Sequence, residues 1–355
     1  MKHNFSAGPS ILPQPVFKEA AEAVLDFNNS GLSILEISHR SPGFMAVMDE
    51  TKALVKELLG IDEGWHVLFL SGGASSQFFM TVMNLLGKDE TAHYIDTGTW
   101  SKKAVQEATR LGNIDVIASS ADKGYTYIPK GVDIPEGGRY LHVTSNNTIF
   151  GTQFHGWPET DCPIVADMSS DIFSRPLDMS KFGLIYCGAQ KNLGPAGMTL
   201  VIIRDKFLEA FKPDIPTMLD YRTHIAKDSM FNTPPVFPIY VSMLTLRWLK
   251  ANGGLSAMAE RNTAKAQLLY DAIDRNPDFN GVVNMEDRSQ MNVTFVLTNK
   301  DLEPKFLEMC EAAGIVGIKG HRSVGGFRAS MYNAMPIESV QVLIDVMDQF
   351  SSIYG

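Results

Sequence analysis

Two neighbouring stretches, PIVADMSS (163–170) and LIYCGAQKNLGPAGMTLVIIR (184–204), decide the fold of this chain. The second stretch contains two apolar runs that are separated by a Gly-Pro turn. All of these runs are continuous rather than alternating, which is typical of strands covered on both faces of a sheet. Asp167 lies within the first stretch and Lys191 ends an apolar run in the second. The two stretches therefore predict adjacent buried strands that carry polar side chains where chemistry is possible.

Apolar runs of similar length precede these stretches, namely HVLFLS (66–71), HYIDTG (93–98) and YLHVTS (140–145). Helical spacing of apolar residues is found at 13–29, 44–60 and 101–112. The helix at 44–60 is expected to stop at Gly60, which suits the residue after a helix. Alternation of such runs and helices predicts an α/β fold with a mostly parallel sheet.

The pattern changes near residue 240, where two long helical stretches follow at 241–254 and 257–275. A strand, a helix, a strand and a final helix come after them, which indicates a second, smaller α+β domain. We therefore predict an N-terminal segment (1–15), a large domain (16–245) and a small C-terminal domain (246–355).

Composition and charge narrow the class of protein. A chain of 355 residues can form two domains that share a cleft. Its net charge of −9 argues against a broad nucleic-acid surface, because phosphate backbones require a basic face. No apolar run approaches a membrane span, and the N-terminus lacks the apolar core of a signal peptide. Three scattered cysteines without CxxC spacing suit a reducing compartment. We expect a cytoplasmic enzyme that binds neither membrane nor nucleic acid.

Several motif classes are missing from the sequence. It contains no GxGxxG after a strand, no GxxxxGK[ST], no HExxH and no GxSxG. Dinucleotide oxidoreductases, P-loop NTPases, zinc proteases and α/β-hydrolases therefore have no motif support, and we expect no metal site.

SGGASSQ (71–77) follows an expected strand and precedes an expected helix. A Gly-rich turn of this kind offers backbone N–H groups and the positive end of a helix dipole to a phosphate. Ser75 and Ser76 could add hydroxyl donors. The alternative is that the segment is only a tight loop.

Asp167 and Lys191 are the strongest candidates for catalysis. A carboxylate within an apolar run is costly unless it is paired. Asp167 could cap a turn through Ser169 or Ser170, or it could hold a protonated pyridine nitrogen. Lys191 could be an ordinary surface charge, but a partly desolvated lysine has a lowered pKa and becomes an amine nucleophile.

Other candidates are weaker when taken alone. Trp100, in DTGTW, could stack on a planar ring or simply pack in the core. Arg40, His321, Arg322 and Arg328 lie beside Gly, Ser or Pro, where they could bind carboxylates or phosphates. They could equally be solvated loop charges.

Seven segments, spread from residue 4 to residue 336, together resemble the phosphoserine aminotransferase family: NFSAGPSILP, EISHRSPGF, ADMSSDIFSRP, YCGAQKNLGPAG, SMFNTPPVFPIY, WLKANGG and KGHRSVGGFRASMYNAMP. The resemblance implies fold type I of the pyridoxal-phosphate enzymes and a homodimer whose active sites lie at the subunit interface. It implies amino transfer between glutamate and 3-phosphohydroxypyruvate, giving 2-oxoglutarate and phosphoserine in serine biosynthesis. A second family substrate, 3-hydroxy-4-phosphooxy-2-oxobutanoate, belongs to vitamin B6 synthesis.

The resemblance also implies roles for individual residues. Lys191 would carry pyridoxal 5′-phosphate as a Schiff base and Asp167 would hold its pyridine nitrogen. The other cofactor contacts would be Ala74, Ser75, Trp100, Thr148 and Gln190, with Asn232 and Thr233 from the other subunit. The substrate's anionic side chain would meet His39, Arg40, His321 and Arg322, and Arg328 would hold its α-carboxylate.

Two positions differ from some members of the family: Ser75 stands where they have Arg, and Ala7 stands where they have Ser. Neither difference affects Lys191 or Asp167. Three alternatives remain open at this point. They are a fold type I aminotransferase for another anionic amino acid, a desulfurase, which would need a mobile nucleophilic cysteine, and a non-catalytic binder of phosphorylated metabolites.

Overall fold

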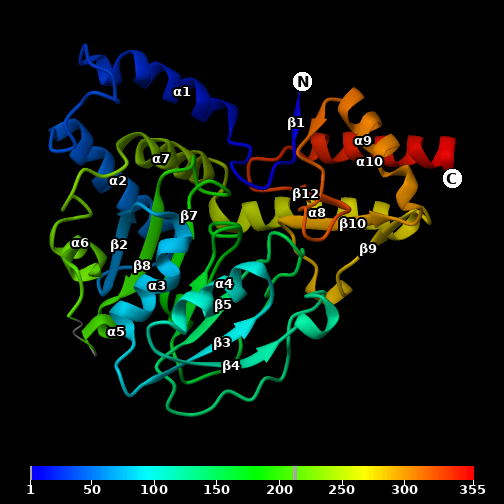
Figure 1. Cartoon of the computed structure of the whole chain (residues 1–355). Helices are drawn as coiled ribbons and strands as arrows, with labels where there is room; N and C mark the ends of the chain where they lie inside the picture. Colours follow the sequence, from blue (N-terminus) through cyan, green and yellow to red (C-terminus); the bar gives the residue numbers. More distant parts are fainter. Residues whose placement is uncertain (1, 210, 212–213) are drawn as a thin grey trace.

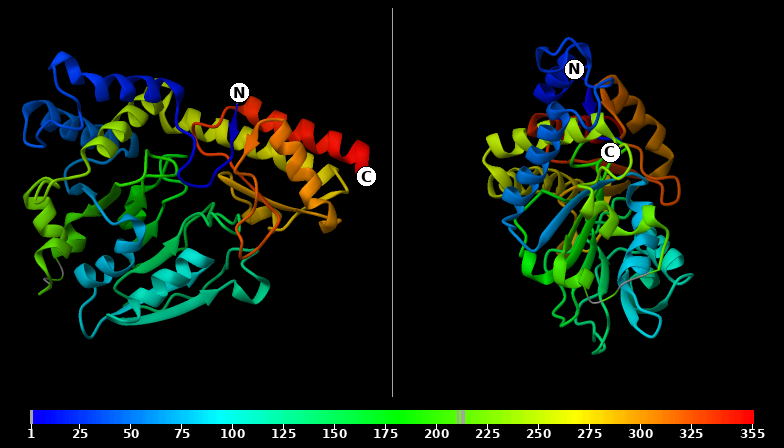
Figure 2. Two further views of the ribbon diagram at one scale, coloured as in Figure 1. Left: turned by 45° about the horizontal axis from the view of Figure 1, so that its top comes forward. Right: turned by 90° about the vertical axis from the view of Figure 1, so that its left-hand side faces the viewer.

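The computed structural model describes residues 2–209, 211 and 214–355. A large sheet with helices on both faces forms one part, and a smaller sheet packed against helices forms the other (Figures 1 and 2). The long helices α7 (Val236–Ala251) and α8 (Gly254–Arg275) connect the two parts. The α/β class expected from the sequence is confirmed.

The large sheet has seven strands in the order β2-β8-β7-β6-β5-β3-β4. All neighbours are parallel except that β8 runs antiparallel to both β2 and β7. The sheet is therefore mostly parallel, as predicted. Its strands are β2 (Trp65–Leu70), β3 (Thr91–Asp96), β4 (Asn113–Ser119), β5 (Leu141–Thr144), β6 (Ile164–Asp167), β7 (Phe182–Gly188) and β8 (Thr199–Arg204).

Alternate residues of the central strands enter two different apolar cores. In β7, Leu184 and Tyr186 pack in the core on one face, and Ile185 and Cys187 pack in the core on the other. Both faces are thus buried, which explains the continuous apolar runs in the sequence. The helices of this part are α1 (Gln14–Leu25), α2 (Pro42–Leu59), α3 (Gly73–Leu85), α4 (Thr99–Ala108), α5 (Asp205–Glu209) and α6 (Tyr221–Ala226).

The smaller part has its own core around a cluster of phenylalanines from β9, β10, α9 and α10. Its antiparallel sheet has the order β12-β10-β9, with β9 (Phe279–Gly281), β10 (Asn292–Leu297) and β12 (Phe327–Ser330). The helices α9 (Glu303–Ala312) and α10 (Ile337–Tyr354) cover it together with α8. The N-terminal strand β1 (His3–Asn4) pairs with β11 (Ile315–Val316), so the start of the chain joins this part.

The element boundaries follow the sequence signals closely. Ser41 caps α2 by accepting a hydrogen bond from the N–H of Phe44, and Gly60 ends the helix in the left-handed conformation expected of it (φ 62°). β4 was not predicted from the sequence. The domain border at 245/246 stays a prediction, and the change from one apolar core to the other falls within α8. Among the described residues, no helix is long and apolar enough to cross a membrane.

Candidate active site

Six of the nine predicted cofactor residues line one cavity of about 110 Å³ at the carboxyl ends of β6 and β7. The carboxyl ends of parallel strands meet at one edge of a sheet, and the N-termini of α3 and α4 open at the same edge. Sequence segments that lie more than 100 residues apart are therefore neighbours here. The lining residues are Gly73, Ala74, Ser75, Phe78, Trp100, Thr144, Asn146, Asp167, Ser169, Ser170, Gln190 and Lys191.

Lys191 is buried, with 9% of its surface exposed, and follows β7 by three residues. Its Nζ donates a hydrogen bond to Thr148 Oγ1 at 2.7 Å. No carboxylate of the described residues lies within 4 Å of this ammonium. Burial lowers the pKa of Lys191 to about 8; the charge of Asp167 opposes this effect and that of Arg328 adds to it. A substantial fraction of the amine is therefore neutral near neutral pH.

Asp167 ends β6 and is also buried. Its Oδ1 accepts hydrogen bonds from the N–H and the hydroxyl of Ser169 at 3.0 and 2.6 Å, while no described donor contacts Oδ2. Burial raises the pKa of this carboxyl, whereas Ser169 and the charge of Lys191 lower it. The turn through Ser169 that the sequence suggested is present, and it leaves one carboxylate oxygen available.

The Gly-rich turn begins α3. Gly72 is the N-cap and has a positive φ of 98°, which a residue with a side chain rarely adopts. Helix α3 then starts at Gly73, so the backbone N–H groups at its start have no partners within the helix. Ser76 donates its hydroxyl to the carbonyl of Gly72 at 3.1 Å, which leaves Ala74 and Ser75 as the residues that face the cavity.

Trp100 is the second residue of α4, and its ring centroid lies 5.6 Å from Lys191 Nζ. Its indole N–H is buried and has no hydrogen-bond partner within the described part of the chain. Thr144 Oγ1, at the end of β5, is also buried and has no hydrogen-bond partner among the described residues. Such atoms cost free energy unless a bound group satisfies them.

Arg328 lies on β12 of the smaller part and contacts the loop after β5, which contains Thr148. Its Nη1 donates to the carbonyl of Thr148 at 3.4 Å, and its Nε is buried without a described partner. His321 and Arg322 lie in the loop before β12, where the ring Nδ1 of His321 bonds Ser323 Oγ at 2.7 Å. Burial lowers the pKa of His321, as do the charges of Arg328, Arg322 and Lys103. Cations from both parts of the molecule thus gather near the cavity.

Eight predicted residues are not among those that line this cavity; Thr148, His321, Arg322 and Arg328 have been described above, and the other four lie in two loops. His39 is half-buried and Arg40 exposed in the loop before α2, and Asn232 and Thr233 are exposed before α7. Asn232 instead lines a second cavity, of about 260 Å³, beside the start of α3. Within a single chain, the structure does not bring these four residues to Lys191.

The structure adds residues that the sequence reasoning missed. Ser10 in the N-terminal segment donates its backbone N–H to the carbonyl of Gln190 at 3.1 Å, and its hydroxyl bonds the carbonyl of Lys191. Lys103, one turn after Trp100, places its Nζ 4.7 Å from the Trp100 ring centroid. In the sequence, Ser10 could have been noticed only because it lies in the same N-terminal segment as Ala7. Lys103 could have been noticed only as a charged residue near the start of an expected helix.

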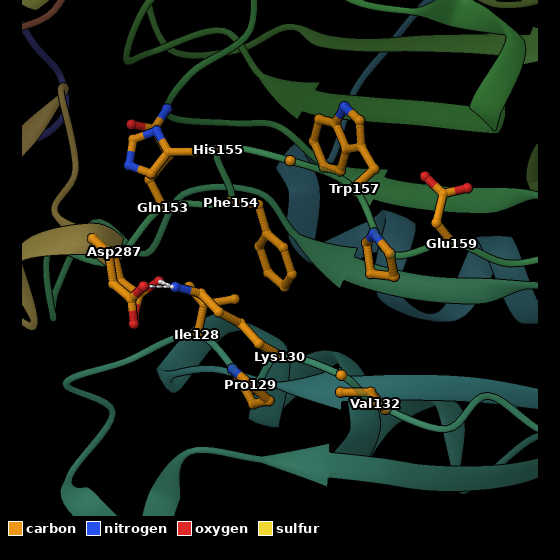
Figure 3. A pocket seen from close by; sticks show the side chains of 14 residues that line it. Ile128, Pro129, Lys130, Val132, Gln153, Phe154, His155, Trp157, Glu159 and Asp287 are labelled. Carbon is orange, nitrogen blue, oxygen red and sulfur yellow. Dashed lines mark ion pairs between the residues drawn. The ribbon is translucent and has the colours of Figure 1, made fainter.

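A larger cavity, of about 480 Å³, lies elsewhere, between the segments 128–132 and 153–159 (Figure 3). It contains none of the predicted site residues. Lys130 crosses it to the carboxylates of Glu286 and Asp287, at 2.6 and 3.1 Å. Size alone therefore does not identify the active site, whereas the buried lysine and aspartate do.

The smaller cavity has the features that pyridoxal phosphate requires. It combines an amine with a lowered pKa, a carboxylate with a free oxygen, an unpaired indole N–H and the start of a helix. The group that these features suit is aromatic and anionic and carries an aldehyde and a basic ring nitrogen. The residues present fit this cofactor.

Comparison with known proteins agrees with this geometry. The family model described as aminotransferase class-V matches residues 2–343. The phosphoserine aminotransferase of Flavobacterium johnsoniae is 59% identical over 352 residues, with 99% of each chain covered. The solved phosphoserine aminotransferase from Bacillus circulans subsp. alkalophilus has a TM-score of 0.97 at 46% identity, covering 100% of this chain and 99% of its own.

A pyridoxal-phosphate-bound phosphoserine aminotransferase from Trichomonas vaginalis has a TM-score of 0.93 at 37% identity and covers 98% of this chain and 100% of its own. An aspartate aminotransferase from Thermus thermophilus, 19% identical with a TM-score of 0.79, shares the fold alone. The family expected from the seven segments is thus confirmed. This chain belongs to the phosphoserine aminotransferases of the class-V aminotransferase family.

Proposed function

We propose that this enzyme, with pyridoxal 5′-phosphate, transfers the amino group of glutamate to 3-phosphohydroxypyruvate, giving 2-oxoglutarate and O-phosphoserine. Relatives that are 53–59% identical along their whole length bear the name of this activity. The single observation that carries the proposal is Lys191, a buried amine whose pKa is lowered to about 8 in the same cavity as Asp167. Serine biosynthesis is the pathway that this reaction serves.

Cofactor binding is assigned to residues that line the cavity. The N–H groups at the start of α3 suit the phosphate because they add a helix dipole to free donors. With the cofactor bound, Ala74, Ser75 and Gln190 would hold its phosphate, Trp100 would stack on its ring, and Thr148, which contacts Lys191, would hydrogen-bond its phenolic oxygen side. When bound, pyridoxal phosphate supplies an electron sink for the bond broken at the substrate's Cα.

Lys191 does the proton transfer. Among the described residues that line the cavity, Lys191 has the only amine, so its Nζ can move a proton to and from the substrate's Cα. A base with a pKa of about 8 is half neutral at a pH near the physiological range, which suits both directions of transfer. Thr148, which accepts the Nζ–H at 2.7 Å, fixes where the amine lies.

Asp167 holds positive charge at the far end of the ring. Its free Oδ2 can accept a hydrogen bond from a protonated ring nitrogen. The two hydrogen bonds from Ser169 keep the carboxylate in place. These bonds favour the charged form, which a buried carboxylate would otherwise lose.

Substrate recognition requires cations, because both amino donors carry an anionic side chain. Arg328 offers a guanidinium fork next to Thr148, which suits the α-carboxylate common to glutamate and phosphoserine. His321 and Arg322 suit the phosphate or the side-chain carboxylate. We assign the same role to His39 and Arg40.

We further infer a homodimer with shared active sites. His39, Arg40, Asn232 and Thr233 lie outside the Lys191 cavity of their own chain, so a second subunit is the route by which Asn232 and Thr233 would reach a cofactor. Mixing inactive Lys191→Ala subunits with inactive Asn232→Ala/Thr233→Ala subunits should restore activity in heterodimers. Failure to restore any activity would contradict the shared site.

The substrate assignment is tested by single turnovers of the holoenzyme with phosphoserine and with alanine. The absorbance of the bound cofactor should change with phosphoserine and not with alanine, and 3-phosphohydroxypyruvate should form in equimolar amount. Lys191→Ala is the matched control, because it leaves the anion-binding residues in place. A holoenzyme that does not react with phosphoserine would overturn the substrate and leave the cofactor assignment standing.

Steady-state kinetics test the order of the steps. Because one site takes the amino donor and the amino acceptor in turn, double-reciprocal lines for glutamate and 3-phosphohydroxypyruvate should be parallel, and intersecting lines would contradict this. The same assay with 3-hydroxy-4-phosphooxy-2-oxobutanoate tests the proposed second use in vitamin B6 synthesis. An enzyme that prefers another anionic amino acid would identify the alternative, a different aminotransferase of this fold.

We place the enzyme in the cytoplasm, on the composition of its sequence alone.

A further inference from the structure

Asp171 is a completely buried carboxylate that the reaction does not use. It lies one turn after Asp167, with its N–H bonded to the carbonyl of Met168 at 3.2 Å. An ionised carboxylate without exposure is costly unless several donors hold it. The structure provides two hydrogen-bond donors, Ser145 and Gln153, and one nearby guanidinium, that of Arg175.

The two hydrogen-bond donors lie at the base of one loop. The chain after β5 forms a hairpin, the 145–154 hairpin, in which the N–H of Asn147 bonds the carbonyl of Thr152 at 2.8 Å and the N–H of Phe154 bonds that of Ser145 at 2.8 Å. Thr148 lies toward the tip of this hairpin, where its hydroxyl accepts the Lys191 ammonium and its carbonyl accepts Arg328.

Asp171 holds both limbs of the 145–154 hairpin. Its Oδ1 accepts the hydroxyl of Ser145 on the outgoing limb, and its Oδ2 accepts Nε2 of Gln153 on the returning limb at 3.1 Å. Arg175 lies 3.8 Å from the same Oδ2 and also donates to the carbonyl of Phe154 at 2.5 Å. The hydroxyl proton of Ser145 goes to the carboxylate because a charged acceptor binds it more strongly than a carbonyl does.

We propose that Asp171 is a positioning residue, which acts by clamping the base of the 145–154 hairpin and so holding Thr148 against Lys191. It contacts neither the amine nor the cavity, because Ser145 and Gln153 stand between them. Its negative charge also raises the pKa of Lys191, against the effect of burial. This inference rests on the proposed function, since the contact that it protects is the one made by the catalytic amine.

The first test is a double-mutant cycle on kcat for phosphoserine and 2-oxoglutarate, using Asp171→Asn, Thr148→Val and the double variant. Because a small displacement of a catalytic contact can cost as much as ~10²-fold in rate, we expect Asp171→Asn to lower kcat by about tenfold or more. KM should change by less than about twofold, since Arg328 is retained. The double variant should be no slower than the slower single variant. Effects that multiply, or an unchanged kcat in Asp171→Asn, would refute the proposal.

Asp287→Asn is the matched control. Asp287 is a second buried carboxylate, and its side chain pairs with Lys130 in the larger cavity (Figure 3). The control removes the same charge and should destabilise the fold without lowering kcat. If Asp171→Asn does not fold, Ser145→Ala takes its place in the cycle, because it removes only one limb of the clamp.

A measurement on the protein without cofactor separates this proposal from the proposed function. The rate of recombination with pyridoxal phosphate should rise with pH as Lys191 loses its proton, with a midpoint at about 8 in the wild type. Asp171→Asn should move this midpoint to lower pH, and Asp287→Asn should leave it in place. If phosphoserine proves not to be the substrate, this shift still decides the role of Asp171, and equal midpoints in all three proteins would refute it.

Discussion

Lys265 allows a pH-dependent stability to be predicted in detail. This lysine of α8 has only 2% of its surface exposed, and its Nζ donates to the carbonyls of Met331 and Tyr332 at 3.1 and 2.8 Å. No ion pair with a described carboxylate compensates its charge. Burial lowers the pKa of Lys265 to about 7, and the charge of Arg261 adds to this.

The sign of the effect follows from proton binding. Between pH 7 and pH 10.5 the unfolded chain keeps this proton and the folded protein releases it, so the folded state gains stability as the pH rises. Integration over pH 7 to 9 gives about 2 kcal/mol from this one group. The entropy of unfolding for 355 residues is about 0.75 kcal/mol per kelvin, so the melting temperature should rise by about 3 °C.

The assay compares thermal unfolding of the cofactor-free wild type and Lys265→Met at pH 7, 8 and 9. The difference between their melting temperatures isolates Lys265, because Lys191 and all other groups titrate in both proteins. We expect that the wild type gains about 3 °C relative to Lys265→Met over this range. Lys102→Met, a change at an exposed lysine of α4, should show no such relative change. Parallel pH profiles for wild type and Lys265→Met would refute the reasoning.

Three further predictions concern the active site. Lys191→Arg should retain the positive charge but lower kcat by at least ~10²-fold, because no base of suitable pKa remains; stopped-flow absorbance with phosphoserine measures it. Asp167→Asn should lower kcat by about 10²-fold or more through the lost charge at the ring nitrogen, while equilibrium dialysis should still detect bound cofactor. Arg328→Lys should raise the KM for glutamate by about tenfold through the lost two-pronged carboxylate contact. An unchanged KM in that variant would place the α-carboxylate elsewhere.

The sequence predicted the parts of the fold that have strong periodicity. The apolar runs of β6, β7 and β8 are buried on both faces, and their continuous pattern follows from that burial. β4 was missed because it is an edge strand in which no residue is buried, and Asn113, Asp115 and Ser119 interrupt its apolar residues, so NIDVIAS lacks the continuous apolar run of the central strands. The antiparallel direction of β8 was also not readable, since the apolar pattern of a buried strand does not depend on its direction.

The candidate site could be predicted where chemistry requires a particular residue type. A lysine and an aspartate at the ends of buried runs are costly, and this cost made Lys191 and Asp167 visible. Thr148 could be named only through the family resemblance, and without that resemblance Arg328 was one of several cations that could equally be solvated loop charges. Their meeting depends on a contact between β12 and the loop after β5, which are 180 residues apart.

The role proposed for Asp171 could not be predicted from the sequence around it. In the sequence it is one more acidic residue in ADMSSDIFSRP, and a turn after a strand is an ordinary place for an aspartate. Its burial becomes evident only in the structure, where Ser145, Gln153 and Arg175 surround it. The proposed role follows only from the contact that Thr148, in the same hairpin, makes with Lys191. Ser145 and Gln153 lie on the two limbs of the 145–154 hairpin and Arg175 lies four residues after Asp171, so we expect a change at any one of them to disturb Thr148 without touching the cavity. Lys191 and Asp167 could therefore be predicted from the sequence, because burying a charge is costly, whereas the residues that hold them in place can be identified only in the structure.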